Sequence, residues 1–334
     1  MGGATPERLA DIGEEDLLAR IFPLFGIEQD AYLPVGPGDD AAVLSVPDGR
    51  VVATTDAMVR GSDWLDHWSS GADVGAKCVA QNVADVAAMG ARPTGLLLTL
   101  AAEPDTRVDW ALDLARGIAQ AAREFGCRVI GGDLSGAPAG LLLVSITALG
   151  DLEGRAPVRR DGARPGDVVA VAGSLGRAAA GLLALERGAG DAAPDLVAAQ
   201  RRPRPPVQEG PRAAELGAHA MIDLSDGLVR DAGRVARASG VTVDLSSAAL
   251  AADVDALVDA GHDVLTSHDA RGCVFGGGEE HSLLAVFPPD VALPGPWRPV
   301  GRIVARSGED STPPSGVTVD GDPVDVQGWD HFGG

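Results

Sequence analysis

Lysine is almost absent from this chain of 334 residues, where Lys77 is the one occurrence. A P-loop binds phosphates with a lysine that ends a glycine-rich loop and is followed by serine or threonine. Lys77 is followed by Cys78 instead. The chain is therefore not a P-loop NTPase.

Positive charge is scarce overall. The 27 Lys and Arg residues are outnumbered by 48 Asp and Glu, which leaves a formal net charge of -21. Nucleic-acid-binding surfaces need basic patches, so this class of function is excluded, and adsorption to an anionic membrane is disfavoured. A negatively charged substrate would have to bind through metal ions or local arginines.

Cysteine is also rare, with three isolated residues. Their spacing fits neither a disulfide framework nor a cysteine-based metal site. The N-terminus lacks the basic and apolar segments of a signal peptide. No apolar run approaches the roughly 20 residues that cross a bilayer. We therefore expect a cytoplasmic protein.

Apolar periodicity predicts helices and strands that alternate in both halves of the chain, an α/β pattern of the α+β type. The predicted helices are 14–25, 73–89, 108–125, 176–186, 211–216 and 228–238. The predicted strands are 51–55, 94–102, 128–130, 141–149, 168–172, 220–222, 241–245, 283–287 and 300–304. Gly276-Gly277-Gly278 does not fit the Gly-x-Gly-x-x-Gly fingerprint, so a Rossmann domain is not expected.

A segment rich in Arg, Gly and Pro, 151–167, has no apolar periodicity and is typical of a joint between domains. It predicts an N-terminal domain over 12–150 and a C-terminal domain over 151–334. In each domain we expect one helical layer packed against one sheet.

Seven aspartates stand out because they follow apolar runs and lie beside small residues. They are Asp39, Asp40, Asp56, Asp85, Asp133, Asp223 and Asp226. Several carboxylates at one place repel one another unless cations lie between them, and Mg²⁺ prefers carboxylate oxygens together with substrate phosphates. The pattern predicts a site for several Mg²⁺ ions and phosphate chemistry, with Thr54 and Thr55 as further oxygen donors. Each aspartate alone could equally be a turn residue or a helix cap.

Three further features favour a nucleotide phosphate as ligand. Gly131-Gly132 follows a predicted strand, where its bare backbone could approach a phosphate. Ser225 precedes a predicted helix, whose first N–H groups attract anions. Arg159 and Arg160 lie in the joint and could bind a phosphate bidentately, or could equally be a solvated charge pair.

Two residues are candidates for a second, cationic ligand. Glu279 follows three glycines that clear space beside its carboxylate. Trp329 lies near the C-terminus, where its ring could stack on an aromatic ring or a cation, or could anchor the end of the chain.

Taken together, these motifs resemble the thiamine-monophosphate kinase family, in the family's order and spacing over about residues 12 to 332. The motifs are Gly36-Pro37-Gly38-Asp39-Asp40-Ala41-Ala42, Thr54-Thr55-Asp56, Gln81 to Ala91, Gly131-Gly132-Asp133, Asp223 to Leu228, and Gly277-Gly278-Glu279. The resemblance implies the fold of the aminoimidazole-ribonucleotide-synthetase superfamily. It also implies a homodimer in which the N-terminal domains form an intersubunit β-barrel, with ATP in a cleft between the two domains of the chain.

The activity that this resemblance implies is ATP-dependent phosphorylation of thiamine monophosphate to thiamine diphosphate. ATP is the co-substrate, several Mg²⁺ ions bind at each site, and the γ-phosphoryl group moves by direct in-line transfer without a phosphoenzyme. Only positioning and charge neutralisation then remain for the protein to supply.

The resemblance assigns roles to individual residues. The implied magnesium ligands are Asp40, Thr54, Thr55, Asp56, Asp85, Asp133, Asp223 and Asp226, supported by Asp39. Asp40, Asp85 and Asp223 are the implied catalytic residues. The implied nucleotide contacts are Gly132, Asp133, Arg160 and Ser225, and the implied substrate contacts are Asp63, Glu279 and Trp329.

Two departures from the family pattern leave alternatives open. Asp63-Trp64 replaces the usual His-Phe, and Glu280-His281-Ser282 replaces the usual Asp-Tyr-Glu. Both departures are expected on the substrate side of the site and none on the metal side. A non-catalytic protein that binds nucleotide or thiamine phosphate is therefore one alternative.

Another ATP-using synthetase of the same superfamily is the second alternative. Selenophosphate synthetase expects a reactive Cys and Lys near the N-terminus, and the hydrogenase-maturation relative expects a C-terminal Cys. This sequence has neither feature. Aminoimidazole-ribonucleotide synthetase stays open as an alternative, although its motifs fit this sequence less well.

Overall fold

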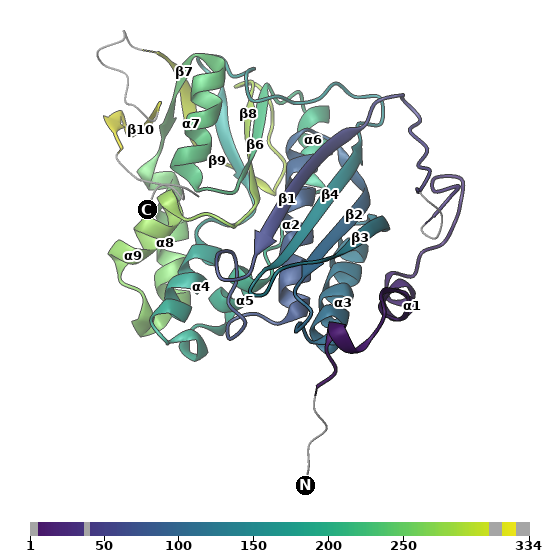
Figure 1. Cartoon of the computed structure of the whole chain (residues 1–334). Helices are drawn as coiled ribbons and strands as arrows, with labels where there is room; N and C mark the ends of the chain where they lie inside the picture. Colours follow the sequence, from purple (N-terminus) through teal and green to yellow (C-terminus); the bar gives the residue numbers. More distant parts are fainter. Residues whose placement is uncertain (1–5, 37–40, 307–315, 325–334) are drawn as a thin grey trace. The chain divides into compact units, whose positions relative to one another are not determined.

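The computed structural model describes residues 6–36, 41–306 and 316–324, apart from the side chain of residue 262. The chain divides into two compact units (Figure 1). The first unit comprises Met1–Val86 and Pro93–Glu153, and the second comprises Ala87–Arg92 and Gly154–Gly334. No helix in the described part of the chain is long and apolar enough to cross a membrane.

The first unit contains a four-stranded mixed sheet with the order β1-β4-β2-β3. Its strands are β1 (Val52–Val59), β2 (Arg92–Ala102), β3 (Arg128–Gly136) and β4 (Leu142–Asp151). β1 pairs antiparallel with β4, whereas β2 pairs parallel with β3. Helices α2 (Gly71–Ala88) and α3 (Val108–Glu124) cover one face of this sheet (Figure 1). Helix α1 (Glu14–Phe25) packs against α3.

The second unit contains a seven-stranded mixed sheet among its described residues, with the order β11-β10-β7-β9-β5-β8-β6. Its strands are β5 (Val168–Ala172), β6 (Ala220–Leu224), β7 (Val241–Leu245), β8 (Ser282–Phe287), β9 (Trp297–Ala305), β10 (Val317–Val319) and β11 (Asp322–Pro323). Its helices are α4 (Arg177–Glu186), α5 (Pro194–Arg201), α6 (Glu209–Glu215), α7 (Leu228–Ser239), α8 (Ser247–Gly261) and α9 (Ser267–Gly276).

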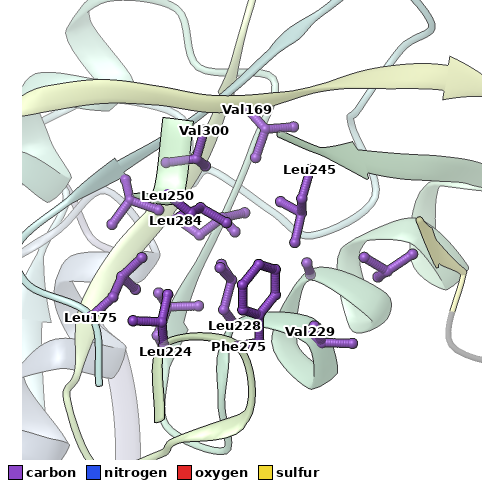
Figure 2. Close-up of a cluster of buried hydrophobic side chains, with 14 of the residues drawn as sticks. Val169, Leu175, Leu224, Leu228, Val229, Leu245, Leu250, Phe275, Leu284 and Val300 are labelled. Carbon is purple, nitrogen blue, oxygen red and sulfur yellow. The ribbon is translucent and has the colours of Figure 1, made fainter. Parts of the chain in front are cut away.

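One apolar core joins strands and helices of the second unit. Figure 2 shows side chains of this core, with Leu224 from β6, Leu228 from α7 and Phe275 from α9 among them. Ile222 belongs to the same core. Since side chains alternate along a strand, Asp223 lies on the opposite face of β6.

Most predicted elements are confirmed, and α1, β5 and β7 have the predicted bounds. The predicted ends of three other strands are wrong, because β1 runs through Asp56 to Val59, β3 through Asp133 to Gly136, and β6 through Asp223 to Leu224. Each of these segments continues to pair with its neighbour, so ladder hydrogen bonds outweigh the low strand propensity of Gly and Asp.

Helices α2 and α3 pack so closely that glycine is required at their crossing. A Cβ atom on Gly117 of α3 would lie 2.1 Å from the backbone oxygen of Ala72, and one on Gly75 of α2 would lie 2.4 Å from the backbone oxygen of Leu114. These contacts are far shorter than van der Waals distances. The two helices therefore meet backbone to backbone at these glycines, and this packing helps to position α2.

We predict that Gly117→Ala lowers the stability of the protein by about 1–3 kcal/mol, because the cost of overpacking exceeds the gain in helix propensity. Gly272 in α9 is the matched control, since a Cβ there would meet nothing within 4 Å. Gly272→Ala should be neutral or stabilising by up to about 1 kcal/mol. Thermal unfolding of both variants measures the difference, and equal melting temperatures would contradict the packing argument.

Candidate functional site

The predicted site residues fall in both units. Asp39, Asp40 and Trp329 lie outside the residues that the structure describes. Within the described ranges, no three His, Cys, Asp or Glu side chains come together as a metal site. The magnesium cluster that the sequence indicates stays a prediction.

In the first unit, Thr54 and Asp85 are in direct contact. The Thr54 hydroxyl on β1 donates a hydrogen bond of 2.7 Å to Asp85 Oδ2 on α2. The Asp56 backbone N–H donates to Asn82 Oδ1, also on α2, at 3.0 Å. Strand alternation puts the side chains of Thr54 and Asp56 on the same face as buried Met58. The structure thus gathers one hydroxyl and two carboxylates where β1 faces α2.

Thr55 and Asp133 have their side chains on the other, open face of this sheet. The Thr55 hydroxyl donates to the backbone oxygen of Ile146 at 3.1 Å. Asp133 Oδ2 accepts a hydrogen bond of 2.7 Å from Ser135 on β3. The side chains of the predicted ligand set therefore do not all converge, because neighbouring residues of a strand face opposite ways.

Gly132 and Asp63 each have a structural explanation. A Cβ atom on Gly132 would lie 2.2 Å from the backbone oxygen of Leu98 on the neighbouring strand, so close strand packing requires glycine there. Asp63 Oδ2 accepts a hydrogen bond of 2.7 Å from the backbone N–H of Val59 and so stabilises the turn after β1. Their contacts with nucleotide and substrate stay predictions.

In the second unit, Asp223 is a buried carboxylate in contact with a histidine. Asp223 is 3% exposed, and its Oδ2 lies 3.2 Å from Nδ1 of His281, which is also buried. His281 belongs to the second departure from the family pattern, and its ring contacts Asp223, a predicted magnesium ligand. Because β8 begins beside the end of β6, a residue just before β8 reaches Asp223.

The predicted nucleotide contact Ser225 and the predicted substrate contact Glu279 are neighbours. The Glu279 backbone N–H donates to the backbone oxygen of Ser225 at 2.8 Å. A Cβ atom on Gly278 would lie 2.4 Å from that same oxygen, so glycine is needed for this approach. Glu279 itself has a φ of 63°, in the left-handed region that a residue with a long side chain adopts only under constraint. The structure brings these two predicted residues together.

Asp231 on α7 is a residue that the sequence analysis missed. It is fully buried, and its Oδ2 accepts hydrogen bonds from the backbone N–H groups of Asp226 at 2.9 Å and Gly227 at 3.1 Å. Arg234 donates to Oδ1 of Asp231 at 2.5 Å and also binds the Asp226 carboxylate. The signal in the sequence was an aspartate four residues after Gly227, placed to reach back over the first turn of the helix.

The remaining polar residues near the predicted site have separate partners. Arg159 pairs with Asp161 at 2.6 Å, whereas Arg160 is exposed. Glu280 accepts a hydrogen bond of 2.9 Å from the backbone N–H of Ala178 and another from the Ser174 hydroxyl. This buried carboxylate therefore satisfies an N–H group in the first turn of α4.

Comparison with known proteins identifies relatives over almost the whole chain. Residues 38–152 match the family model described as AIR synthase related protein, N-terminal domain, and residues 164–292 match the corresponding C-terminal domain. The chain is 43% identical over 326 residues to the thiamine-monophosphate kinase of Mycobacterium tuberculosis. The aligned region covers 97% of this chain and 93% of that protein.

Two solved structures have the same fold over nearly their full length. The thiamine-monophosphate kinase of Stenotrophomonas maltophilia K279a matches with a TM-score of 0.77 and 31% sequence identity. The match covers 94% of this chain and 98% of that chain. The AaThiL structure complexed with AMPPCP and TMP matches with a TM-score of 0.74 and 29% sequence identity. The match covers 99% of this chain and 100% of that chain.

Burial raises the pKa of Asp231 from 3.8 to about 7, and the negative charge of Asp223 adds to this effect. Between about pH 4 and 7 the unfolded chain has released this proton while the folded protein retains it. We predict that the free energy of unfolding of the metal-free protein falls as pH rises through this window, by on the order of 4 kcal/mol from Asp231.

Urea unfolding of the wild type and Asp231→Asn at pH 5, 6, 7 and 8 tests this prediction. The variant should lose less stability across the series than the wild type. Asp109→Asn is the control, because ion pairing with Arg107 lowers the pKa of this exposed carboxyl and keeps it ionised throughout. If the free energy of unfolding changed with pH in the same way in the wild type and in Asp231→Asn, the raised pKa of Asp231 would be contradicted.

Proposed function

The chain belongs to the thiamine-monophosphate kinase family, and we propose that it transfers the γ-phosphoryl group of ATP to thiamine monophosphate, which forms thiamine diphosphate and ADP. The observation that carries this proposal is the identity of 43% over 97% of the chain. The agreement in fold with AaThiL, whose structure holds AMPPCP and TMP, supports ATP and thiamine monophosphate as the two substrates.

Mg²⁺ is the cofactor that we propose for this reaction, and the donor chemistry fits it. Thr54, Asp56 and Asp85 supply hydroxyl and carboxylate oxygens on one side of β1, and Asp223 supplies a buried carboxylate in the second unit. Hard oxygen ligands of this kind suit Mg²⁺, which also retains water and substrate phosphates. We propose these four residues, with Asp40 and Asp226, as residues that hold Mg²⁺ ions.

When bound, Mg²⁺ neutralises the charge of the phosphates and of the transferring group. The protein then has to align a phosphate oxygen of the acceptor with the γ-phosphorus of ATP. Ser225 lies in the turn before α7 and Arg160 is an exposed guanidinium, and we propose both as nucleotide contacts. Since the acceptor phosphate already carries its nucleophilic oxygen, these residues need only bind and orient the two substrates.

Glu279 is the residue that we propose for the thiamine end of the acceptor, together with Asp63 and Trp329. A carboxylate stabilises the cationic thiazolium ring by charge. The hydrogen bond between Glu279 and Ser225 would fix the acceptor side of the site to the nucleotide side. This connection gives the close alignment that direct transfer requires.

A homodimer is the assembly that we propose, with the first unit as its interface. In the described part of the first unit, helices cover one face of the four-stranded sheet, and Leu97 on the other face is 38% exposed. Thr55, Ser145 and Thr147 form a hydroxyl cluster on the same face. A second copy of this sheet would cover these side chains and complete the β-barrel that the family resemblance implies.

We predict that Asp85→Asn lowers the rate of thiamine diphosphate formation at least about 100-fold, since it removes a charge that stabilises the transition state. The amide oxygen of asparagine can still accept the Thr54 hydroxyl, so the fold should be retained. The measurement is an end-point assay with ATP, Mg²⁺ and thiamine monophosphate. Asp105→Asn, at a carboxylate whose side chain is 82% exposed, is the control and should keep full activity.

Near-wild-type turnover of Asp85→Asn would contradict the assignment of this residue. Failure of the wild type to form thiamine diphosphate would contradict the proposed function itself. Circular dichroism of all three proteins separates a catalytic loss from a loss of fold.

We further predict that Leu97→Glu weakens the dimer, because it puts a charge into the proposed apolar interface. Sedimentation should give the wild type twice the chain mass of 33.9 kDa and give the variant a mass nearer to one chain. Leu141→Glu is the matched control, since Leu141 is 37% exposed but precedes β4 in a turn. A monomeric wild type, or equal effects of both variants, would refute this interface.

A further inference from the structure

Two histidines of the second unit pair with buried aspartates at opposite ends of β6. His219 directly precedes β6, and its Nδ1 lies 2.9 Å from Asp167 Oδ2. His281 directly precedes β8, and its Nδ1 lies 3.2 Å from Asp223 Oδ2 near the end of β6. β5 and β6 both run antiparallel to β8, so the two pairs lie at opposite edges of this part of the sheet.

The His281 backbone is held in place by the end of β6. Its N–H donates to the backbone oxygen of Leu224 at 2.9 Å, and its φ of 53° lies in the left-handed region. Two residues earlier, the Glu279 N–H is fixed to Ser225. A histidine with a constrained backbone and a buried ring cannot turn freely, so its Nδ1 has a defined direction.

We propose that His281 is a positioning residue for Asp223. With its proton on Nδ1, the neutral ring donates a hydrogen bond to Asp223 Oδ2, which fixes the plane of the carboxylate and leaves Oδ1 as the oxygen for the metal. The inference deepens the proposed function and rests on its assignment of Asp223 as a magnesium ligand. Carboxylates that bind metals are commonly oriented in this way by an outer partner, and loss of the partner weakens metal binding about 10–100-fold.

Within the second unit, His281 would also connect the acceptor side of the site, at Glu279, with the metal side, at Asp223. The segment Gly278–His281 carries the proposed acceptor contact Glu279 and the histidine that orients Asp223. The family pattern has tyrosine at this position, whose hydroxyl lies at the far end of a longer ring. In this chain the contact with Asp223 is made by Nδ1 of His281, a nitrogen only two bonds from Cβ.

The experiment titrates Mn²⁺ into the full-length protein with a non-hydrolysable ATP analogue, and follows free Mn²⁺ by electron paramagnetic resonance. His281→Ala removes the donor and should raise the Kd of the affected Mn²⁺ by at least about 10-fold. His281→Asn should restore binding to within about 3-fold of wild type, because the asparagine Nδ2 atom occupies the place of histidine Nδ1 and asparagine tolerates positive φ.

His219→Ala and His219→Asn are the matched controls. They disturb a similar histidine–aspartate pair of the same unit, so they should lower the melting temperature without changing Mn²⁺ affinity. His281→Tyr introduces the family residue without a donor at the Nδ1 position, and it should bind Mn²⁺ weakly even if His281→Ala does not fold.

The proposal is overturned if His281→Ala or His281→Tyr binds Mn²⁺ as the wild type does, or if His281→Asn gives no rescue. An equal loss of affinity in the His219 variants would also overturn it, since the effect would then be one of stability. The titration needs no acceptor. A protein that shows the predicted Mn²⁺ effects but forms no thiamine diphosphate would thus contradict the proposed function and leave the role of His281 standing.

Discussion

The burial of carboxylates beside one another is the constraint on which the second unit depends. Asp223 is 3% exposed and Asp231 is fully buried. An isolated buried charge would be very costly, so each carboxylate must be hydrogen-bonded, paired or protonated. Asp231 has two backbone N–H groups and Arg234, while Asp223 has His281. These partners determine the course of the chain from the end of β6 into α7.

Close packing between two backbone segments explains the glycines in the loops around β6. Gly227 has a φ of 114°, and a Cβ atom there would lie 2.5 Å from the backbone oxygen of Gly276. Together with Gly278, it lets the segment before β8 pack directly on the turn before α7. The turn that carries Ser225 and the segment that carries Glu279 are thereby held as one body. A site whose task is alignment of two phosphates needs this rigidity more than it needs a reactive side chain.

Regular periodicity and family motifs made much of this fold predictable. The amphipathic helix 14–25 and the β-branched strands 168–172 and 241–245 agree with the structure because local pattern and tertiary pairing favour the same element there. Strands that contain Asp56, Asp133 and Asp223 were predicted too short, since Gly and Asp indicate turns locally and only pairing across the sheet extends the strand.

Helix α8 has alanine at many positions and buries few large side chains, so its periodicity is weak. Helix α9 had a signal in Thr266 and Asp269, which form a capping box. The contact of His281 with Asp223 arises only in three dimensions, and motif order alone could not reveal it.

Orientation and charge neutralisation are sufficient for phosphoryl transfer only if the γ-phosphoryl group passes directly from ATP to the acceptor. The stereochemistry at phosphorus tests this requirement most directly. ATP with a chiral, isotopically labelled γ-thiophosphoryl group would be incubated with Mg²⁺, thiamine monophosphate and the full-length protein, and the configuration of the thiophosphoryl group in the product determined. We expect inversion, the outcome of a single in-line displacement. Retention would indicate a phosphoenzyme and would contradict direct transfer, and the absence of labelled thiamine diphosphate product would contradict the kinase assignment.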